Sequence, residues 1–163
     1  MNRKLIILVV MVVAVVIVAI FAAPLFLGAV NPPVDVYARP TPPTSESPLD
    51  LLPSQVLGFD LTLIEDGSSD DKLSAMGFYG GGFRIIISRF SSEGAASSEV
   101  DASISFAEDT PGSMTSVHAG EQHWLTFTGG GTSIFLWRKG VWLFLVSAPD
   151  EALRNQVVEE LPF

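Results

Sequence analysis

Cysteine is absent from this sequence of 163 residues, and histidine occurs only twice. Without cysteine the folded chain has no disulfide bonds, no thiolate metal ligands and no thiol nucleophile. Basic residues are also scarce, since nine Lys and Arg stand against 18 Asp and Glu and give a formal net charge of −9. An acidic chain is poorly matched to the phosphates of nucleic acids or to an anionic membrane surface. We therefore expect no nucleic-acid partner.

Charged side chains are missing altogether from residues 5–30, which read LIILVVMVVAVVIVAIFAAPLFLGAV. About 20 apolar residues in a helix span the hydrocarbon core of a bilayer. A lone segment there must be helical, because its backbone has no other hydrogen-bond partners. A cleaved signal peptide, the alternative, would have a shorter apolar region and paired small residues before its cleavage site. Residues 1–30 are therefore predicted to form an uncleaved transmembrane anchor that binds the lipid bilayer.

The basic residues around this stretch predict its orientation. Arg3 and Lys4 precede it, whereas the first basic residue after it is Arg39. Because basic residues favour the cytoplasmic side of a membrane helix, the N-terminus is predicted to be cytoplasmic. The rest of this single-pass protein would then lie outside, in the periplasm or at the cell surface.

Residues 31–54 are rich in proline, with seven prolines between residues 31 and 53. Proline has no backbone N–H, so the segment cannot form a helix interior or a central strand. We predict a semi-rigid linker, which at about 3.1 Å per residue would hold the following domain up to ~60 Å from the bilayer. The alternative is that the segment packs along a neighbouring subunit.

Residues 55–163 have the patterns of one extracytoplasmic α+β domain. Capping serines and an apolar i, i+4 pattern predict a helix over residues 92–102, and an apolar stripe after Pro149 predicts a C-terminal helix. Alternating or β-branched runs predict strands at residues 56–64, 73–79, 83–90, 114–118, 122–128, 132–138 and 141–146. Together these elements predict a mainly antiparallel sheet with helices packed on one face.

The last predicted hairpin turns at Lys139 and Gly140. Because side chains alternate between the faces of a sheet, one face of this hairpin presents four aromatic residues: Phe135, Trp137, Trp142 and Phe144. An apolar patch rich in tryptophan is typical of a docking surface, so these four are the predicted partner-binding residues. The alternative is that loops or the Pro-rich segment cover them.

The candidates for chemistry are sparse. His118 and His123 flank a turn that contains Glu121. Two histidines and a carboxylate can bind zinc, but no further ligand is evident, and histidines beside a turn are commonly polar loop residues. The acidic turn at residues 65–71 is interpreted as solvated rather than as a calcium site. We predict no catalytic residue, no metal site and no cofactor.

These observations favour a membrane-anchored domain that acts by protein binding or assembly, such as an accessory subunit of a membrane protein complex. The alternative is a carrier or sensor of an apolar small molecule, bound under the aromatic face near Trp137 and Trp142. A hydrolase or metalloenzyme that uses His118, Glu121 and His123 ranks last.

Overall fold

The computed structural model of the chain describes residues 31–163, so the predicted anchor at residues 5–30 lies outside the described residues. Within 31–163, no helix is long and apolar enough to cross a membrane. The elements are α2 (Pro48–Leu51), β1 (Gln55–Val56), β2 (Phe59–Asp66), β3 (Lys72–Tyr79), β4 (Arg84–Phe90), α3 (Glu93–Glu108), β5 (Ser113–Ala119), β6 (Gln122–Gly129), β7 (Thr132–Lys139), β8 (Trp142–Ala148) and α4 (Glu151–Glu160).

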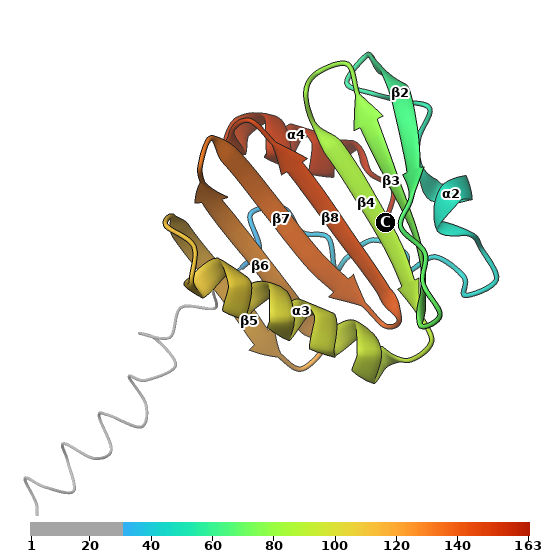
Figure 1. Ribbon diagram of the computed structural model, residues 1–163, viewed down its shortest axis with the longest axis vertical. Coiled ribbons are helices and arrows are strands. Elements are labelled where there is room, and N and C mark those ends of the chain that lie inside the picture. Colours follow the sequence, from blue (N-terminus) through green and yellow to red (C-terminus); the bar gives the residue numbers. More distant parts are fainter. Residues whose placement is uncertain (1–30) are drawn as a thin grey trace, which may run out of the picture. The chain divides into compact units, whose positions relative to one another are not determined.

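The strands form one eight-stranded sheet in the order β1-β2-β3-β4-β8-β7-β6-β5, and every neighbouring pair is antiparallel (Figure 1). Most neighbours are consecutive along the chain and are joined by hairpins. The exception is the central pair, in which β8 returns to β4 and places Ile87 opposite Phe144. The predicted class, a mainly antiparallel α+β domain, is confirmed for the described residues.

The two longer helices lie on opposite faces of this sheet (Figure 1). Helix α3 buries Ala96 and Val100 against the aliphatic side of the sheet, where Leu136 and Leu143 lie. Helix α4 packs with the other core, which contains the aromatic residues. The prediction of helices on one face is therefore wrong. Strands β6 to β8 carry bulky apolar residues on both faces, so each face needs its own cover to be removed from water.

The Pro-rich segment supplies much of the cover on the α4 side. We call residues 32–52 the strap; its trace runs behind the sheet in Figure 1, on the side away from α3. Val36 is 0% exposed, and Val34 and Leu52 are each 8% exposed. The prediction that residues 31–54 form a semi-rigid spacer outside the domain is therefore wrong, and Pro32–Phe163 forms one compact unit in place of the predicted domain 55–163.

Hydrogen bonds to the sheet and to α4 hold the strap, and the sheet supplies side-chain donors for its carbonyls. Lys139 Nζ donates to the carbonyls of Val36 (3.1 Å), Pro40 (3.2 Å) and Arg39. The Trp142 indole N–H donates to the Pro42 carbonyl at 2.9 Å. A proline-rich strand cannot donate to a sheet ladder, but its carbonyls still accept hydrogen bonds. The strap therefore attaches through its carbonyl acceptors and through one donor of its own, the Arg39 guanidinium, which donates to the carbonyls of Val158 and Leu161.

Three predicted elements differ in their bounds. The strand predicted at 56–64 is broken where Leu57 and Gly58 have φ angles of +52° and +78°, and it becomes β1 and β2. The helix predicted at 92–102 continues to Glu108 because Ala107 extends its buried stripe. In the last hairpin, Lys139 pairs with Trp142 and Trp137 with Phe144. A turn at Lys139 and Gly140 would instead pair Trp137 with Trp142. The observed register is therefore shifted by two residues, and the same side chains still share a face.

Tyr79 should make the stability of the domain fall in alkaline solution. Its hydroxyl donates to the Pro53 carbonyl at 2.8 Å, and burial raises its pKa from 10.0 to about 12. Because the folded-state pKa lies above the unfolded one, its contribution is complete below pH 10 and is lost as the pH rises towards 12. We expect a slope approaching about 1.4 kcal/mol per pH unit from this one proton.

The measurement is urea unfolding at several pH values for the wild type and Tyr79→Phe. The difference between the two free energies of unfolding should narrow above pH 10. A difference that stays constant up to pH 12 would show that Tyr79 titrates normally.

Candidate functional site

The four predicted partner-binding residues are core residues. Phe135, Trp137, Trp142 and Phe144 are each 0% exposed. They stack in sequence, with Trp137 and Phe144 at 5.3 Å between ring centroids and Phe144 and Phe163 at 4.7 Å. The strap, α4 and the C-terminal Phe163 belong to the same core cluster. A partner cannot contact these side chains in this arrangement, so the predicted docking face is wrong. The Pro-rich segment covers the four side chains, as the alternative stated.

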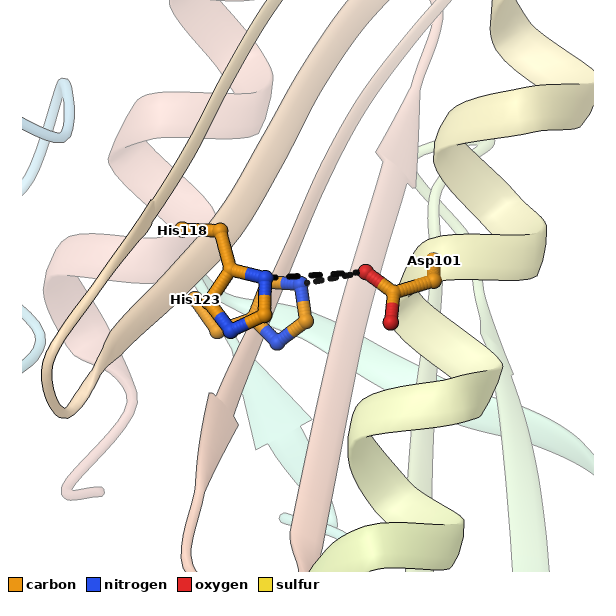
Figure 2. A group of neighbouring side chains, drawn as sticks. All are labelled: Asp101, His118 and His123. Atoms are coloured by element: carbon orange, nitrogen blue, oxygen red, sulfur yellow. Dashed lines mark ion pairs between the residues drawn. The ribbon is translucent and has the colours of Figure 1, made fainter.

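The structure instead gathers a histidine pair and an aspartate on the α3 side of the sheet (Figure 2). His118 on β5 and His123 on β6 are direct cross-strand partners in the hairpin that turns at residues 120–121. Paired residues of an antiparallel ladder project from the same face. Asp101 on α3 points its carboxylate toward both rings, as Figure 2 shows.

The distances in this cluster are short. Asp101 Oδ1 lies 3.1 Å from His123 Nε2 and 3.8 Å from His118 Nδ1. The two imidazole rings are stacked, with centroids 3.9 Å apart and planes at 13°. The possible ligand atoms of all three residues lie within 4.8 Å of one another, and among the described residues no other group of three His, Asp or Glu does so.

His123 is the buried member of the cluster. It is 0% exposed, its Nδ1 lies 3.2 Å from Ser97 Oγ, and its backbone N–H donates to the Tyr37 hydroxyl at 2.9 Å. Burial lowers the pKa of His123, and His118 lowers it further, while Asp101 raises it in opposition. The imidazole is therefore favoured in its neutral form.

Only part of this site was visible in the sequence. The turn carboxylate Glu121 is exposed and stays outside the cluster, so the structure replaces it with Asp101. Asp101 and Ser97 are four residues apart on α3 and therefore face the same way. That spacing was readable, but the packing of α3 across β6 was not. The acidic residues of the turn after β2 form no such group among residues 31–163.

An apolar pocket of about 380 Å³ lies between α3 and the sheet. Its lining is almost wholly apolar and includes Phe106, Ala107, Leu125, Phe127, Leu136 and Leu145. Phe106 is 74% exposed at its mouth. The pocket for an apolar ligand was expected near Trp137 and Trp142, so this cavity lies on the opposite face from the expected one.

A second hollow of about 360 Å³ lies beside α2, and we call it the α2 groove. Three of its lining side chains are large, apolar and unusually exposed: Leu49 at 51%, Ile64 at 43% and Leu73 at 42%. Glu65 and Asp66 also line it. The groove therefore combines apolar contact surface with negative charge.

The fold and sites define an α+β protein with an eight-stranded antiparallel sheet and helices packed against it. No protein-family model matches the chain, and no curated protein matches its sequence. A crystal structure described as a GTP-binding regulator from Thermotoga maritima aligns with a TM-score of 0.48 and 14% identity, over 74% of this chain and 91% of that chain. At this score the likeness carries no conclusion for this chain.

Proposed function

We propose that this protein is a membrane-anchored extracytoplasmic domain that binds a membrane protein partner through the α2 groove. The exposed apolar side chains of the groove are the single observation that carries the proposal. Large apolar side chains exposed together are typical of interaction sites, and the aromatic face that was first expected to serve is buried.

The partner's chemistry follows from the groove. Leu49, Ile64 and Leu73 offer contacts to apolar side chains, while Glu65 and Asp66 favour basic ones. The domain as a whole is acidic, with a formal charge of −9 for the chain. We therefore propose a protein segment with apolar anchors flanked by Lys or Arg, since complementary charge speeds encounter and fixes register.

The short connection between the predicted anchor and the strap favours a partner close to the bilayer. The predicted anchor ends at residue 30, and Val34 is already part of the domain core. Only residues 31–33 lie between them, and each residue spans at most about 3.6 Å. A domain tethered so shortly would meet proteins of the same membrane rather than distant soluble ones.

Site-specific photo-crosslinking in cells tests this proposal. A photo-crosslinking amino acid at position 73 should give an adduct with an integral membrane protein, and Ile64→Ser should lower its yield about tenfold, as expected when an interface loses a central apolar contact. The same probe at position 106, a still more exposed apolar site on α3, is the matched control and should give no such adduct. Equal adducts at both positions, or none at 73, would contradict the proposal.

The apolar pocket at α3 supports a second function, carriage of an apolar small molecule. Its volume of about 380 Å³ and apolar lining suit a single acyl chain or a comparable ligand. Mass spectrometry of the full chain after mild detergent extraction would then find a stoichiometric apolar ligand, which Phe106→Ser would release and Ile64→Ser would retain. A protein adduct through position 73 without such a ligand favours the first function.

A further inference from the structure

We propose that Asp101, His118 and His123 form a binding site for a divalent cation of the zinc class, which ties α3 to the β5–β6 hairpin. This site is independent of the α2 groove and of the proposed partner. It needs no covalent step, because the cation acts as a bridge between secondary-structure elements.

The donor spacing suits one shared ion. Zinc binds imidazole nitrogen at about 2.0–2.1 Å and carboxylate oxygen at about 2.0–2.2 Å in tetrahedral geometry. Neighbouring ligand atoms around such an ion are therefore about 3.3 Å apart. Asp101 Oδ1 lies 3.1 Å from one histidine nitrogen and 3.8 Å from the other, and all three donors lie within 4.8 Å of one another, so a small rotation of a side chain brings them to these separations.

His123 gives the second, independent reason. Its side chain is 0% exposed, and its Nε2 has no hydrogen-bond partner among the described residues. The Ser97 hydroxyl can pair with Nδ1 in either tautomer; in the tautomer that binds a metal, Nδ1–H donates to Ser97 Oγ and the Nε2 lone pair is directed at the site. A lone pair 3.1 Å from a carboxylate oxygen is repelled by it. A cation between the two atoms turns this repulsion into attraction on both sides.

The hydrogen bonds around His123 are of the kind that orient a metal-binding histidine. A histidine that binds metal usually has its other ring nitrogen hydrogen-bonded, which fixes the tautomer and the ring orientation. Ser97 is placed to do this from α3, one turn before Asp101. The Tyr37 hydroxyl holds the His123 backbone N–H at 2.9 Å and so fixes the ligand's position on β6.

His118 is the adaptable ligand. The rings of His118 and His123 are nearly parallel in the structure, at 13°. Because a ligand lone pair lies in the plane of its ring, the His118 ring must tilt for both nitrogens to meet one ion. Its side chain is 57% exposed, so this rotation meets little resistance.

The donor set selects the kind of cation. Two imidazoles and one carboxylate suit zinc and its neighbours in the transition series, whereas calcium and magnesium prefer a shell of oxygen ligands. Three protein ligands leave one tetrahedral position for water. The ligands come from α3, β5 and β6, so the ion would join the helix to the edge hairpin.

Zinc titration of the full chain in mild detergent, after chelator treatment and monitored by competition with a chromophoric chelator, tests the proposal. We expect one saturable zinc site whose occupancy raises Tm. Asp101→Asn and His118→Gln should each weaken zinc binding at least about 100-fold, since changes that merely disturb a ligand's orientation cost 10–100-fold. Both side chains are more than half exposed, so both variants should keep the native circular dichroism spectrum.

Glu121→Gln is the matched control, because it removes an exposed carboxylate from the same hairpin turn but outside the cluster. It should bind zinc like the wild type. Proton NMR adds a structural readout, since zinc should shift the ring signals of both histidines in the wild type and neither in Asp101→Asn. Equal affinity in all four proteins, or the absence of saturable binding, would overturn the proposal and leave the cluster as a polar contact between Asp101 and the histidines.

Discussion

A chain that begins at residue 54 is expected to be unfolded or aggregated, whereas a chain that begins at residue 31 folds. The shorter chain loses Val34, Val36 and Leu52 from the core. Burial of an aliphatic side chain of this size is worth about 1.5–3 kcal/mol, so three of them contribute on the order of 5–9 kcal/mol. That is comparable with the whole stability of a typical domain, about 5–15 kcal/mol.

The polar consequences of the truncation act in the same direction. Lys139 is 7% exposed and donates to three strap carbonyls. Without the strap, the Lys139 ammonium group has none of these three acceptors and lies beside an apolar surface. The Trp142 indole N–H likewise loses its acceptor, the Pro42 carbonyl. The uncovered aromatic residues would form a large apolar patch, which promotes aggregation.

Size-exclusion chromatography and urea unfolding of the two chains measure this effect. Two substitutions in the longer chain provide the matched comparison, because both introduce the same charged residue into the strap. Val36→Asp replaces a buried side chain and should unfold the domain, while Ser45→Asp replaces an exposed one and should change the stability by less than about 0.5 kcal/mol. If the chain that begins at residue 54 unfolded cooperatively with unchanged free energy, the strap would be the dispensable linker that the sequence predicted.

Trp142→Ala is expected to cost about 3–5 kcal/mol of stability, the range for truncation of a buried aromatic residue. Trp142 is 0% exposed and stacks with Phe144 at 6.3 Å between centroids. The guanidinium of Arg89 lies 5.9 Å from its ring. Alanine would remove the packing, the cation–π contact and the hydrogen bond to Pro42 together.

Trp142→Phe separates these contributions, since it keeps a buried ring but removes the indole N–H. It should cost less than alanine, at about 1–3 kcal/mol for an unpaired Pro42 carbonyl and a small cavity. The urea midpoint measures both changes, and an unchanged m-value shows that the unfolding transition stays two-state. Phe106→Ala is the control, because this aromatic residue is 74% exposed and its loss should be nearly neutral. An equally small effect of Trp142→Ala would mean that the strap does not depend on this residue.

The hairpin of β7 and β8 illustrates how much of the fold could be predicted. Alternation alone placed Phe135, Trp137, Trp142 and Phe144 on one face, and the structure keeps them together. The observed turn begins and ends one residue later than the predicted one. Each residue of β7 therefore pairs with a residue of β8 two positions further along, and each face keeps the same side chains. A register error of two residues leaves each side chain on its predicted face of the sheet, because side chains alternate with a period of two residues.

The candidate site shows where prediction from the sequence stopped. The hairpin that pairs His118 with His123 spans only a few residues, and both were identified from the turn between them. Asp101 lies 17 residues before His118 and reaches the pair only because α3 crosses β6. No local pattern encodes that crossing, so the nearby Glu121 was chosen in its place.

The sequence by itself determined the α+β class, the positions of most strands, and the division of β7 and β8 into an aromatic and an aliphatic face. These are local properties that follow from the spacing of apolar side chains along a strand. Only the tertiary structure decided what covers each face. The strap took the aromatic face because its carbonyls meet donors on Lys139 and Trp142, residues about 100 positions away in the chain. Many segments of a chain can satisfy the hydrophobic effect, which has no direction, and such long-range hydrogen bonds select one of them.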